Sequence, residues 1–373
     1  MQEPWHRGAQ TINGDWPVPV DLLPDETITS WLARCALAQG CDPSALTGSL
    51  WPAWRIWTTD ADRGIPTDRR GALERATGVA GAAIEAAALV PIGTRIVGDH
   101  PKDQAAWPWI STLGKGGGPT SRRQYCPKCL DEDATSHYRL RWRMAWHAGC
   151  AVHGCTLSDR CPRCDSAQQL HRLRADARDI AVCAACGFDL RGIETSPCRA
   201  DTLEFQKTAD RVARAGAGTC FDQQVDAAAW FATADFVCSL IRRVTRSPTK
   251  GLTRVLAAAG IDRPLRLHGV PGARIERLGV EDRHALLGAV QRVMRLKPDA
   301  LSEALKVAGI TRQGLLGDRR RLPEALKHAL PAMPDRPATD RRRPRRRPRG
   351  PRPRHEVRAM MKRLARKLDR NRQ

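Results

Sequence analysis

Cysteines and histidines are concentrated in one part of this sequence, and their spacing is that of metal ligands. The 39 residues from Cys126 to Cys164 contain six cysteines and three histidines. Cys126 and Cys129 form a C-x2-C pair, and Cys150 and His153 form a C-x2-H pair after an interval of 20 residues. A spacing of two residues lets one turn direct two donor atoms at a single ion. The pattern predicts a first metal site with three sulfur ligands and one nitrogen ligand.

A second set of ligands follows at once. Cys161 and Cys164 form one C-x2-C pair, and Cys183 and Cys186 form another after 18 residues. Tetrahedral sets of thiolate and imidazole ligands suit Zn²⁺, whereas Mg²⁺ and Ca²⁺ prefer oxygen. Redox-active C-x-x-C motifs are a weaker interpretation, because here the pairs come in matched sets. We therefore predict two zinc ions, one in each set.

The two sets favour structural zinc over catalytic zinc. A catalytic zinc usually has three protein ligands and an open position for water, and both sets here already hold four ligands. Three spare candidates lie nearby, namely His137, His147 and Cys155. His147 competes with His153 as a ligand, and we favour His153 for its two-residue spacing. No H-E-x-x-H or deaminase-type H-x-E motif accompanies the ligands.

The segment between the first two pairs combines apolar and basic residues. From Tyr138 to Trp146, apolar side chains alternate with Arg139, Arg141 and Arg143. Strict alternation predicts a strand with one apolar face and one basic face. Two interpretations of the basic face remain open: the arginines contact nucleic-acid phosphates or a partner's acids, or they are simply solvated.

Positive charge is concentrated at the end of the chain. The net charge is +22, and residues 336–373 contain 17 Lys and Arg residues against three acids. Such density indicates a polyanionic partner, DNA or RNA, although a tail that only increases solubility is the alternative. The tail arginines that we expect to bind nucleic acid are Arg341, Arg342, Arg343, Arg345, Arg346 and Arg347. The last residues, from His355, predict a basic amphipathic helix for nucleic acid or a protein partner.

The fold class predicted for the whole chain is mainly α with a small β component. Residues 1–115 show helical patterns, such as "DETITSWLAR", where Asp25 is a candidate N-cap and Ile28, Trp31 and Leu32 lie on one apolar face. An Ala-rich helical stretch follows, in which Gly78 predicts a turn. Residues 120–195 form a tandem zinc-ribbon-like block that follows a glycine-rich linker. Residues 200–334 indicate a helical C-terminal region. Residues 335–373 form an Arg- and Pro-rich tail that cannot bury a core, so we expect it to be disordered before its terminal helix.

The C-terminal region contains an internal near-repeat with an offset of 49 residues. "LTRVLAAAGIDR" begins at Leu252, and "LSEALKVAGITR" begins at Leu301 and ends at Arg312. Each predicts an amphipathic helix, a glycine-centred turn and the start of another helix. Two interpretations stay open: helix-turn-helix units that read DNA, with Arg312 as a candidate contact, or the packing of an ordinary helical bundle.

Several function classes are disfavoured by what the sequence lacks. No run of about 18 apolar residues predicts a membrane span, and the first residues do not resemble a signal peptide. We therefore expect a protein of the bacterial cytoplasm, associated with the nucleoid and not with a membrane. The segment "GKGGGPTS" does not match a phosphate-binding loop, so the chain is not expected to be an ATPase.

Several of these motifs together resemble the TniQ family of transposition accessory proteins. "LLPDETITSWLAR" supplies Glu26, Ser30, Trp31, Leu32 and Arg34, and "YCPKCL" is followed by a W-R segment, C-x2-H-G and "CPRC". The resemblance covers roughly residues 17–190, and residues 51–110 fit it poorly. The Arg- and Pro-rich tail departs from the short members of the family.

The resemblance implies a non-catalytic role. TniQ-like proteins help to select target DNA, directly or through a targeting complex, and recruit an AAA+ ATPase regulator that works with a transposase. On this basis the expected partners are DNA, the ATPase and, indirectly, the transposase, with a homodimer left open. Glu26, Trp31 and Arg34 become candidate partner-binding residues. The alternative is a zinc-containing transcription regulator that uses the helices of residues 252–316.

Overall fold

The computed structural model describes residues 14–97, 107–111, 113, 123–268, 273–317, 319, 321–330 and 361. The chain divides into two compact units, Met1–Met333 and Pro334–Gln373, and every element named below lies in the first. The glycine-rich linker and, apart from Met361, the basic tail with its predicted terminal helix lie outside the described residues. The four predicted segment boundaries stay predictions.

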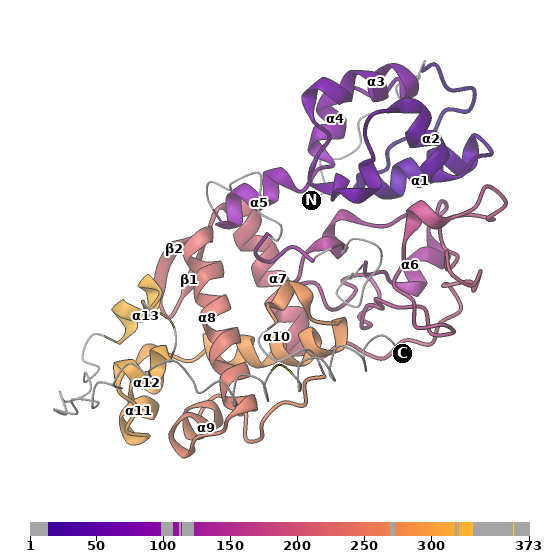
Figure 1. Ribbon diagram of the computed structural model, residues 1–373. Coiled ribbons are helices and arrows are strands. Elements are labelled where there is room, and N and C mark those ends of the chain that lie inside the picture. Colours follow the sequence, from indigo (N-terminus) through magenta and orange to yellow (C-terminus); the bar gives the residue numbers. More distant parts are fainter. Residues whose placement is uncertain are drawn as a thin grey trace. The chain divides into compact units, whose positions relative to one another are not determined.

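The N-terminal part of the first unit is helical, as predicted, and is drawn in indigo to purple in Figure 1. Gly78 ends one helix in the left-handed conformation, with φ of 71°, which confirms the turn expected there. The helices are α1 (Ile28–Ala38), α2 (Pro43–Leu50), α3 (Thr67–Thr77), α4 (Gly81–Ala86) and α5 (Val90–Val97), with 3₁₀ turns η1 (Ile56–Thr58) and η2 (Ala61–Arg63).

The start of α1 differs from the prediction. The N-cap is Thr27, whose side-chain oxygen accepts a hydrogen bond from the Ser30 amide, and not Asp25. Asp25 instead has a positive φ of 59° and pairs with Arg141. The predicted apolar face of the helix is confirmed, since Ile28, Trp31 and Leu32 are all fully buried. They belong to a core of their own, formed by residues between 28 and 88.

The cysteine-rich block contains little regular structure. It holds the short helix α6 (Pro127–Glu132) and the 3₁₀ turns η4 (Leu140–Arg143) and η5 (Leu170–Arg172). The prediction of a strand from Tyr138 to Trp146 is wrong. The chain forms the 3₁₀ turn η4 there, with isolated β-bridges at Arg139 and Met144 on either side. The turn explains why Arg143 and Trp142 are both buried although alternation placed them on opposite faces.

The C-terminal part is a helical bundle with one two-stranded hairpin. Phe221 and Asp222 form its two-residue turn, both at positive φ, which is the geometry that matches strand twist. Helix α8 contacts α5, α7, α10 and α13 and is the central element of the bundle (Figure 1). The elements are α7 (Ala200–Ala215), β1 (Ala217–Cys220), β2 (Gln223–Asp226), α8 (Ala227–Arg246), α9 (Lys250–Ala257), η6 (Ile275–Arg277), α10 (Val280–Met294), α11 (Pro298–Val307), α12 (Arg312–Leu316) and α13 (Glu324–Ala329).

The two copies of the near-repeat form similar but unequal units. Gly260 and Gly309 both follow the ends of their helices at positive φ, 69° and 63°. A second helix, α12, follows only the second copy, and it is five residues long. In the first copy Pro264 disfavours helical backbone at the residue before it, so the predicted second helix is absent there. The helix-turn-helix interpretation is therefore not confirmed, whereas α9 and α11 do pack against each other.

Within the described residues, no helix combines the length and the apolar character that crossing a bilayer requires.

Candidate metal centres

Three of the four ligand pairs lie on turns with the same hydrogen-bond pattern. In the turn that starts at Cys183, the Cys183 amide donates to the Phe188 carbonyl, and the Gly187 amide donates back to Cys183. The turns that start at Cys150 and Cys161 repeat both bonds. The fifth residue of each turn is left-handed: Gly154 has φ of 61°, Asp165 of 53° and Gly187 of 71°. Glycine and aspartate tolerate this conformation, so the local sequence fixes the direction of both donors.

The remaining pair, Cys126 and Cys129, lies at the start of a helix instead of on a turn. Cys126 is the N-cap of α6, Pro127 occupies the first helical position, and Cys129 lies within the first turn. Proline is favoured at the first position because no intrahelical partner exists for an amide there. One helical turn then places both thiols on the same side, facing the turn that carries Cys150.

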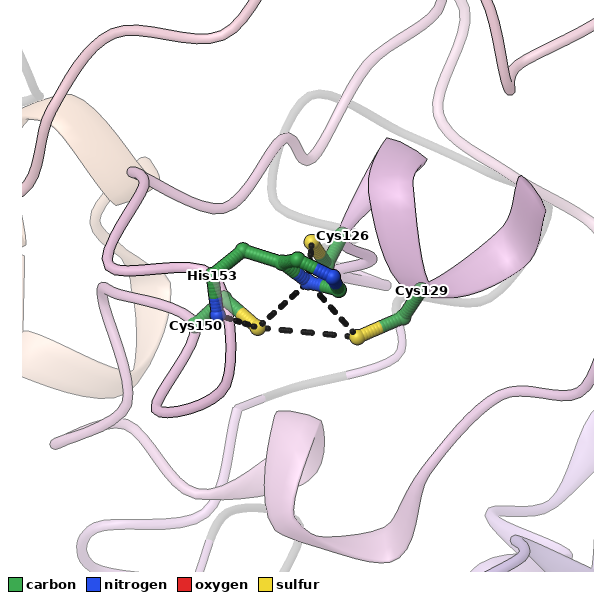
Figure 2. A group of neighbouring side chains, drawn as sticks. All are labelled: Cys126, Cys129, Cys150 and His153. Atoms are coloured by element: carbon green, nitrogen blue, oxygen red, sulfur yellow. Dashed lines mark hydrogen bonds between the residues drawn. The ribbon is translucent and has the colours of Figure 1, made fainter. Parts of the chain in front are cut away.

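The first ligand set, defined as Cys126, Cys129, Cys150 and His153, is assembled around one point. Figure 2 shows the three sulfurs and the imidazole directed toward one another. The Nδ1 atom of His153 lies 3.4 Å from both Cys126 Sγ and Cys129 Sγ and 3.5 Å from Cys150 Sγ. Cys129 Sγ and Cys150 Sγ are also 3.5 Å apart.

These distances fit a tetrahedral zinc ion. Zn–S bonds of about 2.3 Å and a Zn–N bond of about 2.0 Å place tetrahedral ligand atoms about 3.5–3.8 Å from one another. The three thiols of the set are buried, with relative exposures of 0%, 2% and 3% for Cys126, Cys129 and Cys150. Zinc bound there would hold α6 and the Cys150 turn together. Thiolate and imidazole donors also exclude the ions that prefer oxygen.

The second ligand set, defined as Cys161, Cys164, Cys183 and Cys186, is assembled in the same way but lies nearer to solvent. The sulfur atoms of Cys161 and Cys186 are 3.7 Å apart, as are those of Cys164 and Cys183. In each set the ligand atoms all lie within 4.8 Å of one another. Cys161 and Cys183 are buried, whereas Cys164 is exposed and Cys186 half-buried. An ion in this set would be the more accessible of the two.

The spare candidates near the first set lie outside it. His147 is buried and pairs with Asp210, its Nε2 atom lying 2.8 Å from the carboxylate. His137 contacts the Thr135 carbonyl oxygen at 3.0 Å. Cys155 touches the set without joining it, with its sulfur 3.6 Å from Cys126 Sγ. The choice of His153 over His147 therefore agrees with the geometry.

An acidic residue supports the histidine of the first ligand set, and the sequence analysis did not predict it. Glu132 Oε2 lies 2.8 Å from His153 Nε2, the ring nitrogen that faces away from the sulfurs. A carboxylate in this position fixes the ring orientation and makes the other nitrogen a better metal donor. The signal available in the sequence was an acid at the end of the helix that begins with the first ligand pair.

The three arginines between the ligand pairs are engaged within the protein. Arg139 donates two hydrogen bonds to Asp133, at 2.7 and 2.9 Å, and Arg141 pairs with Asp25. The side chain of Arg143 is only 1% exposed, so it cannot contact phosphate in this conformation. The predicted basic face therefore does not exist as one surface; Arg141, with 45% of its side chain exposed, is the member best placed for an external contact.

Arg143 links the cysteine-rich block to the N-terminal helices. Its guanidinium lies 2.5 Å from Asp62 and 2.8 Å from Asp60, and it donates to the Ser111 carbonyl at 3.0 Å. Asp62 also accepts from the amide of Thr29 in the first turn of α1, at 2.8 Å. Burial alone would raise the pKa of Asp62, but the guanidinium groups of Arg143 and Arg123 hold that pKa below its usual value. Asp62 is therefore ionised at neutral pH, and the ion pair connects the two regions.

The N-terminal motif that carries part of the family resemblance also faces inward. The Glu26 side chain accepts hydrogen bonds from Ser30 Oγ at 2.7 Å and from Arg34 at 2.6 Å. Ser30 Oγ in turn accepts from the Tyr138 amide at 2.9 Å, and the Trp31 indole donates to the Val20 carbonyl. Glu26 and Trp31 are buried, and the Arg34 side chain is 12% exposed. Ser30 thus joins α1 to the cysteine-rich block. A direct partner-binding role would require the buried Glu26 and Trp31 to leave the interior.

The other arginines predicted to contact nucleic acid are Arg312 and those of the basic tail. Arg312 is the first residue of α12 and is half-buried. The tail arginines from Arg341 to Arg347 lie outside the described residues. Their contact with nucleic acid stays a prediction.

Comparison with known proteins supports one family. Residues 17–157 match the model of the TniQ family, which confirms the resemblance predicted from the sequence over that segment. The matched segment contains α1, the Arg143 ion pair and the whole first ligand set, and it ends before the second ligand set. No curated protein matches the chain.

Proposed function

We propose that the chain, whose residues 17–157 match the TniQ family model, is a non-catalytic accessory protein of DNA transposition. In this proposal it binds target DNA, directly or through a targeting complex. It also recruits an AAA+ ATPase that regulates the transposase. The observation that carries the proposal is the family match. Within the matched segment, the hydrogen bond between Ser30 and Tyr138 joins the N-terminal motif to the cysteine-rich block.

The geometry of the ligand sets supports a structural role for the metal. Four protein donors surround each candidate site, and a tetrahedral ion bound by all four has no position left for a water molecule. Zinc would then stabilise the folded block, with apparent free energies on the order of 10–16 kcal/mol for such sites. The sites would supply a rigid scaffold, and chemistry at the transposon ends would belong to the transposase.

Binding measurements on the holoprotein test the proposal. The chain, purified with two zinc ions, is assayed for binding to duplex DNA and for capture of an AAA+ ATPase encoded next to it. We expect both interactions, and we expect them to be lost when a chelator removes zinc and unfolds the block. Folded protein with two zinc ions that binds neither partner would refute the proposal.

A zinc-containing transcription regulator is the second candidate. It is favoured by the repeated helix-and-glycine units α9 and α11, which lie beyond the matched segment. The genes beside this one separate the candidates without any biochemistry. Adjacent transposase and ATPase genes support the transposition role, and an isolated gene next to the promoter that it controls supports the regulator.

A further inference from the structure

The outer face of α9 is basic and its inner face is apolar. Lys250 and Arg254 lie one turn apart and are both exposed, as is Arg246, the last residue of α8. The opposite side of α9 is formed by Leu252, Val255 and Leu256, which are buried. Helix α9 therefore holds Lys250 and Arg254 toward solvent, and the exposed Arg246 lies four residues before Lys250, at the end of α8. We call these three residues the basic face.

This basic face has no acidic partner among the described residues. No ion pair joins Arg246, Lys250 or Arg254 to an acid of the part of the chain that the structure describes. Like charges four residues apart on a helix repel each other, so this arrangement destabilises the isolated helix slightly. By contrast, Arg139, Arg141 and Arg143 in the cysteine-rich block each have a carboxylate. Residues 242–268 hold seven Lys and Arg residues against one acid, Asp262.

The internal repeat provides a comparison within the same molecule. The offset of 49 residues extends back into the preceding helices, where Arg243, Val244 and Arg246 correspond to Arg292, Val293 and Arg295. Each copy is thus a long helix followed by a short one: α8 with α9, and α10 with α11. Corresponding helices of the two copies pack against each other, since α8 contacts α10 and α9 contacts α11.

The copies differ in the charge of the short helix. Lys250 corresponds to Asp299, and Arg254 corresponds to Glu303. All four side chains are exposed. Because the second copy folds with acids at these positions, the cations of the first copy are not required for folding, and a ligand explains them better.

We propose that the basic face of α9, extended by Arg246, contacts DNA phosphates, and that the corresponding face of α11 does not. This inference rests on the proposed function, in which the chain binds DNA, and assigns that binding to one surface. Phosphate contacts of this kind position a protein on DNA without reading its sequence. An asymmetric pair of helical units would then set the orientation of the chain on the duplex.

The test exchanges the residues of one copy for those of the other. The variant is Lys250→Asp with Arg254→Glu, which places the second copy's side chains on α9. The matched control is Lys207→Asp with Arg211→Glu, an exposed pair at the same spacing on α7. Affinity for a fluorescent duplex is measured over a range of salt concentrations on full-length holoprotein, with zinc content and thermal unfolding as checks of folding.

We expect the α9 variant to bind about tenfold more weakly at low salt and to lower the slope of log K against log salt by about 2, as the loss of two phosphate contacts predicts. The α7 control should keep its affinity within about twofold. Unchanged affinity and slope in the α9 variant, with wild-type protein still binding DNA, would overturn the assignment and leave the proposed function standing. Equal losses in both variants would also overturn it, since only net charge would then matter. Wild-type protein that binds no duplex but binds anionic vesicles would overturn the α9 assignment and direct DNA binding together.

Discussion

Residues at the candidate metal sites fall into two groups: those that would bind the ion, and those that hold a ligand in position. Cys150 and His153 would bind the ion, whereas Gly154 permits the turn that carries them and Glu132 orients the imidazole. A substitution should therefore have consequences that depend on which of these two roles it removes. The two ligand sets allow these consequences to be measured one ion at a time.

Replacing a donor should remove one ion. We expect Cys150→Ser to lower the zinc content from two ions per chain to one, because a hydroxyl is a poor ligand for zinc beside two thiolates. Cys41→Ser is the control, since Cys41 belongs to neither set, and it should retain two ions. Native mass spectrometry gives the count, and two ions in Cys150→Ser would show that this set is not the site.

Glu26 should give stability a pH dependence. Burial raises the pKa of Glu26 to about 7, from an unperturbed value of 4.5. An acid whose pKa is higher in the folded state stabilises the fold at low pH, and this contribution is lost as pH rises from about 5 through about 7, by about 2–3 kcal/mol. Glu26→Gln cannot titrate, so it should lack this loss.

The measurement is the unfolding free energy of both proteins between pH 5 and pH 8, in excess zinc. Metal binding has its own pH dependence, so the informative quantity is the difference between wild type and Glu26→Gln. The unfolding free energy of Glu26→Gln relative to wild type should increase as pH rises. A constant difference would mean that Glu26 keeps one protonation state throughout the range.

At the scale of elements, ion pairs connect segments that are far apart in the sequence. Arg143 joins η4 to Asp60 and Asp62 beside η2, and through Asp62 to the start of α1. Asp210 of α7 accepts hydrogen bonds from Trp146 and His147, at 2.7 and 2.8 Å. The cysteine-rich block is therefore attached to helices on both sides by buried polar contacts as well as by apolar packing.

Breaking the Arg143 pair should be costly. Arg143→Met leaves Asp62 buried without its main partner, and loss of one member of a buried pair typically destabilises by about 3–5 kcal/mol. Arg141→Met removes a pair whose arginine is 45% exposed, which typically costs less than about 1 kcal/mol. Urea unfolding of the two variants provides the comparison. Equal destabilisation would show that the Arg143 connection is no stronger than a surface pair.

The two ligand sets should release zinc at different rates. Cys164 is exposed, whereas the three thiols of the first set are buried, so a chelator reaches the second ion more easily. We expect one ion to leave quickly and one slowly. Cys183→Ser should abolish the fast phase and Cys150→Ser the slow one. The reverse assignment would mean that opening of the block, and not exposure, controls release.

At the scale of the whole molecule, the sequence predicted features set by local spacing. Both ligand sets, the apolar face of α1 and the turn at Gly78 follow from residues close together in the chain, and all agree with the structure. Features that depend on distant partners were not predicted. The partners of Arg143 lie 81 and 83 residues away, and that of Arg141 lies 116 away, so alternation alone suggested a basic strand where the chain forms a turn.

The same limit applies to the N-terminal motif. Family resemblance made Glu26, Trp31 and Arg34 candidates for partner binding, yet the fold directs all three toward the interior. A motif can recur in a family because it holds two parts of one domain together. Surfaces that differ between otherwise similar units, such as the outer faces of α9 and α11, point to external partners more directly.

We propose that this chain connects DNA to an ATPase that regulates a transposase. The most direct measurement is the amount of an AAA+ transposition ATPase that is retained on immobilised duplex DNA, with and without the holoprotein. We predict that retention increases with the two-zinc chain and returns to the background level after chelation. Retention that is the same with and without folded, two-zinc protein would contradict this connecting role.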